Sequence, residues 1–219
     1  MYLRLNSDEL AIQDIFRSFF ESECSIERVR TSQHTGFDTE AWERLVETGA
    51  PGMCLPEHIG GGGAPLTTGA IVADLVGEFV APLPFIEHLV ASRLLASLAP
   101  DHDLIPALIS GEKIASLALQ PTEDDQAKLV PGGAIADAVI ACKGNDLVVT
   151  SGDDSISLLR NTADLPLAHR SLNDAETIAS GGAAVERFSR ARSEWQALMA
   201  VALTGLGRKA VDIGVAYAK

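Results

Sequence analysis

The chain has 219 residues, of which 47% are hydrophobic and 21% are charged, and its formal net charge is −13 at pH 7. This length and composition predict a globular protein of one or two domains. The negative charge repels nucleic acid, and charged residues interrupt the apolar stretch over residues 70–98, so we expect neither a nucleic-acid partner nor a membrane span.

The spacing of cysteine and histidine argues against two further classes of site. Cys24, Cys54 and Cys142 are far apart and odd in number, which disfavours a disulfide framework or a zinc site and suits a reducing compartment. The five histidines show no spacing that would place two ligands on one helix face. The first residues lack the pattern of a secretory signal. We therefore expect a soluble, cytoplasmic protein that binds no metal.

A helical stripe near the N-terminus predicts the first helix. Asn6 and Ser7 are the candidate N-caps that precede it. The apolar residues at helical spacing are Ile12, Ile15, Phe16, Phe19 and Phe20. This face must bury against the rest of the protein.

A second helix has complete start and stop signals. Asp38 is its candidate N-cap, and Phe37 precedes the cap and can pack against Trp42. Gly49 is placed to end the helix.

Two further helices follow a glycine-rich loop over residues 60–63. Residues 71–80 carry a third apolar stripe, which Pro82 and Pro84 end. The fourth helix begins near Pro84 and extends to Leu98.

The residue period changes after Gly111, where short β-compatible runs replace the helical stripes. The runs are residues 114–119, 135–142, 147–150 and 156–159, and residues 144–146 predict a hairpin turn. The spacings are too short for helical crossovers between parallel strands, so we expect a small antiparallel sheet or partial barrel.

Helical periodicity returns near Ser189 and continues to Lys219 without a stop signal. The broad apolar face of this helix comprises Trp195, Leu198, Met199, Ala202, Leu206, Ala210, Ile213 and Tyr217. This face carries more apolar surface than the visible chain can cover, so we expect a homo- or hetero-oligomer.

Together these patterns predict an α+β protein in three parts. They are an N-terminal helical bundle over residues 1–113, a small antiparallel β domain over residues 114–188, and a long helix over residues 189–219 that begins an incomplete C-terminal helical domain.

Three stretches, in their order and spacing, resemble the acyl-CoA dehydrogenase family. Residues 55–63, LPEHIGGGG, resemble the family's PEEYGG-x-G loop. Residues 104–119 are similar to its entry into the β domain, and residues 205–219 resemble its G-x-A-x-x-A-L-x-x-A-x-x-Y-A helix. The resemblance covers nearly the whole chain.

This resemblance implies a flavoprotein of lipid or fatty acid metabolism. In the family, bound FAD accepts a hydride from the β-carbon of an acyl-CoA thioester while a glutamate removes the α-proton. The implied cofactor is therefore FAD, and the implied substrate is an acyl-CoA.

The family's flavin-contacting turn, T-E-P-x-x-G-S-D, is replaced here by residues 120–125, QPTEDD. The resemblance gives Leu119, Gln120 and Thr122 as candidate cofactor-binding residues. The acidic residues 123–125 could bind a cation, although a lone acidic turn is usually a solvated face.

One subgroup of the family carries its catalytic base on the long helix, at the position that Trp195 occupies here. Glu194 is the nearest carboxylate and lies about 100° round the helix. Glu194 is thus the candidate base, and Glu194 and Trp195 are candidate substrate-binding residues. The alternative for Glu194 is a solvated glutamate near the helix start, stabilised by the helix dipole.

Two glycine patterns have structural alternatives. Gly205-x-Gly207-x-x-Ala210 matches a dinucleotide fingerprint by letters, but it lies within a helical pattern, so packing through small residues is the better account. Residues 60–63 are not followed by the lysine of a P-loop; they form either a permissive surface loop or a loop near a substrate mouth.

We therefore expect an acyl-CoA dehydrogenase-like flavoprotein that is a fragment or a degenerate subunit, inactive alone. One alternative is a non-catalytic partner subunit of a heteromeric acyl-CoA dehydrogenase. Another is a flavin-dependent monooxygenase on the same scaffold.

Overall fold

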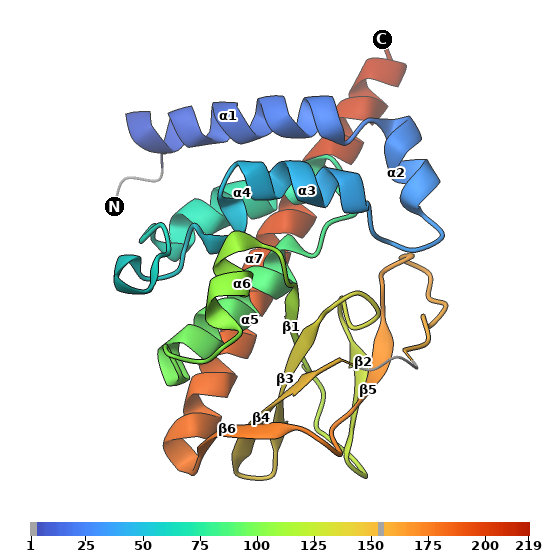
Figure 1. Ribbon diagram of the computed structural model, residues 1–219. Helices are drawn as coiled ribbons and strands as arrows, with labels where there is room; N and C mark the ends of the chain where they lie inside the picture. The colour runs from blue at the N-terminus through green and yellow to red at the C-terminus, as the bar shows by residue number, and fades with distance from the viewer. Residues whose placement is uncertain (1–3, 153–155) are drawn as a thin grey trace.

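The computed structural model describes residues 4–152 and 156–219. Figure 1 shows the helices gathered at one end, the strands at the other, and the long helix α7 running past both. The helices are α1 (Ser7–Glu23), α2 (Ile26–Ser32), α3 (Thr39–Glu47), α4 (Leu66–Glu78), α5 (Phe85–Leu98), α6 (Ile105–Ser110) and α7 (Gly182–Tyr217), with short 3-10 turns at Ala50–Gly52 and Glu57–Ile59. The strands are β1 (Ala115–Leu117), β2 (Gln126–Val130), β3 (Ala138–Lys143), β4 (Asp146–Ser151), β5 (Ala168–Ser171) and β6 (Glu176–Ser180). The predicted α+β class is confirmed.

The predicted caps of the first helices are confirmed. The Oδ1 atom of Asn6 accepts from the backbone N–H of Glu9 at 2.9 Å, and the Glu9 carboxylate accepts from the Asn6 N–H at 2.8 Å. Asp38 caps α3 by accepting from the N–H of Ala41 at 3.0 Å, and Gly49 follows this helix with a φ of 76°. Helix α2 was not predicted, because its 7 residues are too few to show a stripe.

Helices α4 and α7 approach each other through two glycines. Gly77 lies against the carbonyl group of Ala202, so a Cβ at this position would overlap that oxygen. Gly205 lies in the same way against the carbonyl group of Asp74, whereas Gly207 has no neighbour within 4 Å. Packing through small residues is therefore confirmed for Gly205 and is wrong for Gly207.

A charge network joins this helix crossing to α1. Arg17 of α1 donates to both carboxylate oxygens of Glu78 on α4, at 2.6 and 2.9 Å. Arg208 of α7 pairs with Asp74 and lies 3.7 Å from Glu78. The hydrogen bonds from Arg17 lower the pKa of Glu78 below its ordinary value. The network therefore stabilises three helices together as long as Glu78 is ionised.

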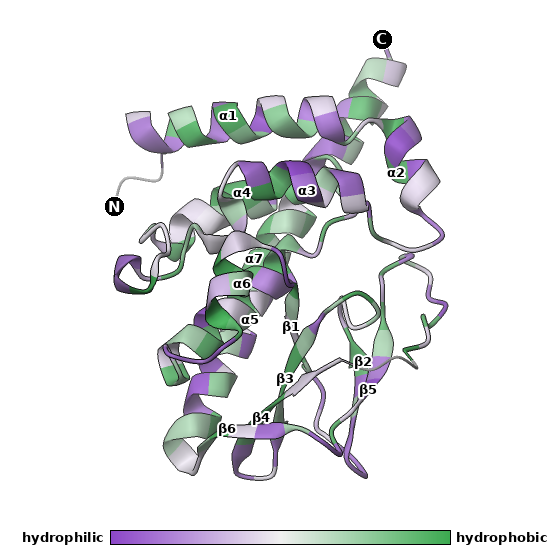
Figure 2. Cartoon of the chain, viewed as in Figure 1, coloured by the Kyte–Doolittle hydropathy of each residue, from purple (hydrophilic) through white to green (hydrophobic). Residues whose placement is uncertain are grey.

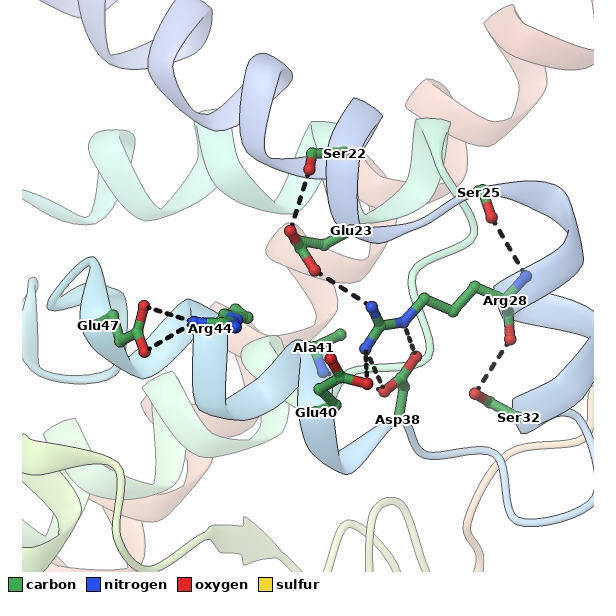
Figure 3. A network of polar contacts seen from close by, with 10 residues as sticks. All are labelled: Ser22, Glu23, Ser25, Arg28, Ser32, Asp38, Glu40, Ala41, Arg44 and Glu47. Carbon is green, nitrogen blue, oxygen red and sulfur yellow. Dashed lines mark hydrogen bonds and ion pairs between the residues drawn. The ribbon is translucent and has the colours of Figure 1, made fainter.

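Arg28 lies at the centre of a second network, between α1, α2 and α3 (Figure 3). Its Nε and Nη2 atoms donate to the two carboxylate oxygens of Asp38 at 2.6 and 3.0 Å. The same guanidinium pairs with Glu23 at 3.2 Å and with Glu40 at 3.3 Å. The hydrogen bond from Arg28 is the main reason that the pKa of Asp38 is lowered, and the bond from Ala41 adds to it.

His88, fully buried on α5, links the helices to the first strand. Its Nε2 donates to the carbonyl oxygen of Leu108 on α6 at 3.0 Å, and its Nδ1 accepts from the N–H of Ala115 in β1 at 3.3 Å. These two partners require the neutral ring, and burial lowers the pKa of His88 to about 4. Beyond β1 the core continues through β3, which Figure 2 shows as a strongly hydrophobic strand.

The strands form a four-stranded sheet in the order β1-β3-β4-β6 and a two-stranded sheet of β2 and β5. The hairpin between β3 and β4 pairs Lys143 with Asp146 across Gly144 and Asn145, which confirms the predicted turn. Strand β1 pairs with β3 in parallel, so the expectation of an entirely antiparallel sheet is wrong. The parallel pairing is possible because β2 and residues 131–137 return the chain between them.

Periodicity predicted a strand over residues 156–159 and missed three others. Residues 156–159 are irregular and lead into a loop that Asn161 holds, through hydrogen bonds to the backbone N–H and C=O of Leu165. Strand β2 is hidden in the sequence because Leu129 has a φ of 50° and the register shifts after Ala127. Strands β5 and β6 are short, and β6 buries none of its residues, so neither shows the alternation of a half-buried strand.

Helix α7 begins at Gly182, and the predicted start near Ser189 is wrong. Ala184 and Phe188 on its first turns are buried, so the helical face starts before the predicted position. The glycine pair Gly181-Gly182 hides this start, because two glycines resemble a turn.

The apolar stripe of α7 is covered in one half and exposed in the other. Leu198 is 2% exposed, and Trp195 and Met199 pack against the core. Beyond the glycine crossing the exposed apolar residues are Leu206, Val211, Ile213, Val215 and Tyr217. Figure 1 shows this end of α7 extending past α1. The expectation of uncovered apolar surface is therefore confirmed for the last third of the helix and wrong for Trp195, Leu198 and Met199, while Leu203, just before the glycine crossing, is 59% exposed.

The Arg28 network predicts a measurable role for Asp38. Asp38→Ala removes both a helix cap and a part-buried ion pair, and we expect it to lower the free energy of unfolding by about 2–3 kcal/mol at pH 7. Glu40→Gln is the matched control, because Glu40 contacts the same guanidinium from an exposed position and its loss should cost under about 0.5 kcal/mol. Urea titration followed by circular dichroism measures both.

A second variant, Asp38→Asn, tests whether the ion pair with Arg28 contributes to this stability, through the pH dependence of the free energy of unfolding. Because the folded-state pKa of Asp38 is lowered, its contribution is present above the unfolded pKa of about 3.9 and is lost as the pH falls through the folded value. The difference between wild type and Asp38→Asn should therefore shrink below about pH 4. A difference that is the same at pH 7 and pH 3 would contradict the ion-pair account.

The helix crossing predicts opposite effects for two neighbouring glycines. Gly207→Ala should raise the melting temperature slightly, since alanine favours a helix by roughly 0.5–1 kcal/mol over glycine. Gly205→Ala makes the same chemical change, but its methyl group would overlap the Asp74 carbonyl and force α4 and α7 apart, so it should lower the melting temperature. Differential scanning calorimetry of the two variants decides the point; equal effects would refute the close contact.

Candidate functional site

Helices α4, α5 and α7 form one side of an apolar cavity of about 500 Å³. The opposite side comes from α2 and from residues 163–165. Apolar side chains that line the cavity include Val29, Val76, Leu83, Ile86, Met199 and Leu203. Gly77 and Ala202 lie in its wall as well, so the glycine contact between α4 and α7 helps to set its shape. The volume is within the range that small-molecule sites occupy.

The loop before β5 closes this cavity against α2. The Gln33 Nε2 atom donates to Asp164 Oδ2 at 2.6 Å. Gly36, with a φ of 69°, lies so close to the backbone of Asp164 that no side chain would fit there. The cavity is therefore assembled from the helical and the β regions together.

Two carboxyl groups, those of Glu87 and Asp164, line this cavity, and Glu87 is the one on the helical side. Glu87, on the first turn of α5, accepts a hydrogen bond from Trp195 Nε1 on α7 at 3.2 Å. Gly132, between β2 and β3, lies beside the Glu87 side chain. Burial raises the pKa of Glu87 above its ordinary value, and hydrogen bonds from its own backbone N–H and from Trp195 oppose this shift.

Glu194, the candidate base, pairs with Arg93, whereas its neighbour Trp195 bonds to Glu87. Its Oε2 pairs with Arg93 Nε at 3.3 Å, and Arg93 also donates to the carbonyl oxygen of Cys54 at 2.9 Å. Because α7 begins at Gly182, the interpretation of Glu194 as a helix-start glutamate is wrong. To act as a base, Glu194 would have to leave the ion pair with Arg93. The pair lines a second, more polar hollow with Ser97, Glu186, Arg187 and Arg190.

The three candidate flavin-contacting residues follow β1. Leu119 is half-buried, Gln120 is exposed, and Thr122 Oγ1 donates to the carbonyl oxygen of Cys142 at 3.0 Å. None of the three lines the apolar cavity. The structure therefore does not bring them to the wall where Trp195 meets Glu87.

The turn over residues 123–126 does not suit the diphosphate of FAD. Two backbone hydrogen bonds between its first and last residues close it, with Asp124 and Asp125 at positive φ. Carboxylates of this turn pair with Lys128 and Lys143, so the nearby cations are already engaged. Carboxylates repel a phosphate, and a phosphate site needs free N–H groups or cations. The residues present therefore do not fit FAD at this turn.

The structure distinguishes between the two interpretations of the glycine-rich loop over residues 60–63. The glycine-rich loop is held by its own backbone: the N–H of Gly62 donates to Gly52 and that of Gly63 to Leu55, at 3.0 and 2.8 Å. No residue of that loop lines the apolar cavity, which disfavours the substrate-mouth interpretation. Within residues 4–152 and 156–219, no cluster of side chains is suited to a metal ion, and no helix is long and apolar enough to cross a membrane.

Sequence reasoning singled out Trp195 and missed its partner Glu87. The available signal is that Glu87 lies in the apolar run over residues 85–90, FIEHLV, where a buried carboxyl needs a polar partner. That partner is 108 residues further along the chain, so the sequence does not reveal the pair.

Comparison with known proteins gives the relatives of this chain. Residues 6–112 match the model of the N-terminal domain of acyl-CoA dehydrogenases. The acyl-CoA dehydrogenase IpdE2 of Mycolicibacterium smegmatis is 26% identical over 224 residues, which cover 98% of this chain and 66% of that protein. The protein of the same name from Mycobacterium tuberculosis is 33% identical over 122 residues, which cover 55% of this chain and 36% of that protein. The chain thus spans less than the full length of either relative.

Solved structures share the fold at lower identity. A variant of the Tcur3481-Tcur3483 steroid ACAD has a TM-score of 0.81 at 22% identity, with 96% of this chain and 66% of that chain covered. The ChsE4-ChsE5 complex from Mycobacterium tuberculosis has a TM-score of 0.76 at 21% identity, with 90% of this chain and 64% of that chain covered.

The matched sequence covers the helical region, and the shared fold extends through the strands and into α7. On this basis the chain belongs to the acyl-CoA dehydrogenase family.

Proposed function

We propose that this chain is a subunit of a heteromeric acyl-CoA dehydrogenase and that it receives the acyl group in the cavity between α4, α5 and α7. The observation that carries the proposal is the apolar cavity of about 500 Å³. Removing a hydrocarbon group from water into such a cavity is favourable by about 25 cal/mol for each Å² buried. A cavity of this kind therefore suits the acyl part of a thioester.

The remainder of an acyl-CoA is polar and anionic, so it must lie outside the apolar space. Arg30 and Gln33 are on the α2 side of the cavity, where a cation and an amide suit a polar ligand. The α2 side is thus the proposed entrance.

Two observations favour a division of labour in which another chain supplies FAD and the catalytic base. The turn over residues 123–126 presents carboxylates where the family contacts its flavin, and Glu194 is held by Arg93. The ChsE4-ChsE5 complex, which shares the fold, is an assembly of two different chains. The exposed apolar end of α7 offers a surface for such a second chain.

The proposed compartment is cytoplasmic. Cys24 and Cys54 are buried free thiols, and Cys142 is a free thiol as well. Free thiols persist where the environment is reducing.

Binding without turnover tests the proposed role. The 219-residue chain should bind octanoyl-CoA more tightly than CoA alone in isothermal titration calorimetry, yet it should not reduce an artificial electron acceptor. Val76→Trp should fill the cavity and weaken octanoyl-CoA binding at least about tenfold. Val211→Trp is the control, because Val211 is exposed beyond the helix crossing.

Other results would contradict the role. Equal affinity for octanoyl-CoA and CoA would mean that the cavity does not take the acyl group. Turnover by the chain alone that Glu194→Gln abolishes would overturn the division of labour. Met199→Trp gives a second way to fill the cavity if Val76→Trp unfolds the chain.

The exposed end of α7 predicts association. In the absence of its partner the chain should self-associate at low micromolar concentration, because Leu206, Ile213 and Tyr217 are exposed and share one face of the helix at its spacing of 100° per residue. The double change Ile213→Lys and Tyr217→Lys should lower the mass measured by light scattering. Asp212→Lys is the matched control, since it adds a lysine on the same turn and removes no apolar side chain. A wild-type monomer that binds no hydrophobic dye would refute the prediction.

A further inference from the structure

The polar hollow between α5 and α7 is separate from the apolar cavity, and the two share no lining residue. Its volume is also about 500 Å³. The charged side chains that line it are Arg93, Arg187, Arg190, Glu186 and Glu194. Its apolar lining comprises the buried Leu94 and Ala191 and the small, exposed Ala183. The polar hollow thus combines an apolar part with three guanidinium groups and two carboxylates.

Two of these arginines are held by backbone carbonyl groups of other segments. Arg93 of α5 donates through Nη1 to the carbonyl oxygen of Cys54 at 2.9 Å. Arg187 of α7 donates through Nη1 to the carbonyl oxygen of Ser97 on α5 at 2.6 Å. A guanidinium has five N–H groups on one rigid plane, so such a bond positions the group and leaves other donors.

Arg187 differs from the other two arginines in its charge balance. Within residues 4–152 and 156–219, no carboxylate forms an ion pair with Arg187, whereas Arg93 pairs with Glu194 and Arg190 with Glu186. Arg187 is therefore a positioned cation that the described part of the chain does not neutralise.

The two carboxylates bind their arginines weakly. Glu186 lies 3.6 Å from Arg190, and the two side chains are 76% and 73% exposed, so water screens this pair. Glu194 accepts one hydrogen bond of 3.3 Å from Arg93, longer than the roughly 2.7–2.9 Å of a strong charge-assisted bond. An incoming anion can therefore compete for both guanidinium groups.

We propose that the polar hollow binds a small organic anion, with a phosphate or carboxylate group at one end and an apolar remainder. Arg187 contacts the anionic group, and Arg93 and Arg190 add to the positive potential around it. The planar fork of a guanidinium matches two oxygen atoms of either group. Leu94 and Ala191 contact the apolar remainder, which the volume of the hollow accommodates.

This site goes beyond the function proposed for the apolar cavity. The polar hollow lies along the first part of α7, whereas the exposed apolar end proposed for a second chain lies beyond the glycine crossing (Figure 1). The net charge of −13 repels anions from most of the surface, which makes a group of three arginines unusual in this chain.

Binding of phenyl phosphate tests the proposal. NMR of the nitrogen-15-labelled chain follows the backbone N–H signals of residues 183–194, which should shift in a saturable way as phenyl phosphate is added. Arg187→Gln should raise the dissociation constant about tenfold, because a charge-assisted hydrogen bond is lost. Arg192→Gln is the matched control: it makes the same change on the same helix, at an exposed position that does not line the polar hollow, and should leave binding unchanged.

A second variant fills the polar hollow and keeps every charge. Ala183 is exposed, so Ala183→Leu should fold, and its larger side chain should weaken binding of phenyl phosphate more than binding of inorganic phosphate. Benzoate is the probe for the other anionic group: tighter binding of phenyl phosphate identifies a phosphate ligand, and tighter binding of benzoate identifies a carboxylate.

Three results would overturn the proposal. One is the absence of a saturable shift with every probe at millimolar concentration. Another is an equal loss of binding in Arg187→Gln and Arg192→Gln, which would indicate a general attraction to the helix charges. The third is unchanged binding of phenyl phosphate in Ala183→Leu. If Arg187→Gln does not fold, Arg190→Gln replaces it, since Arg190 is exposed, and unchanged binding in that variant would equally overturn the proposal.

Discussion

The close approach of α4 and α7 is the constraint on which the rest of the structure depends. At Gly77 and Gly205 the backbone of each helix lies directly against the other, which no residue with a side chain would allow. This contact fixes the depth at which α7 passes the helical region, and thereby brings Val76 of α4 and Met199 and Leu203 of α7 into one cavity wall. A larger separation of the two helices would open that wall. Two positions without side chains thus help to set the shape of the apolar cavity.

Charge and burial act at different places in this arrangement. The networks around Glu78 and Asp38 lie at the edges of the helical region, where partial exposure keeps the cost of ionisation low. Further inside, two polar side chains bond to neutral groups: His88 is held in its neutral form between α6 and β1, and Glu87 accepts from the indole N–H of Trp195. A full charge also lies in the interior: the guanidinium of Arg170 is fully buried and donates to the carbonyl oxygens of Gly133 and Ala136.

The features that could be predicted from the sequence are those that depend on residues close together in the chain. Caps such as Asn6 and Asp38, and the turn at Gly144, follow from residues near one another in the chain, and they were predicted correctly. The parallel pairing of β1 with β3 depends on a path that leaves the sheet and returns, and periodicity does not encode such a path. Strand β2 was hidden by the positive φ of Leu129.

The candidate site depends even more on contacts between residues that are remote in the sequence, which periodicity does not predict. Trp195 and Glu194 were predicted as site residues from resemblance, and the structure shows that Trp195 donates to Glu87 while Glu194 pairs with Arg93. Both partners come from α5, about one hundred residues away, so their pairing is a property of the tertiary structure. The roles of Leu119, Gln120 and Thr122 in binding a flavin stay predictions. The cavity itself could not be inferred, because its walls come from segments that are remote in sequence.

The hydrogen bond between Gln33 and Asp164 has a consequence for how the molecule folds. Its two ends are 131 residues apart, so it closes a long loop of chain. Closing such a loop costs conformational entropy, and other contacts offset this cost only when both regions are already formed. We therefore expect this hydrogen bond to form late in folding. The helices and the strands can each reach their local structure before the wall between α2 and residues 163–165 exists. We therefore expect this wall to form after the helical and β regions, and to open when the two regions separate.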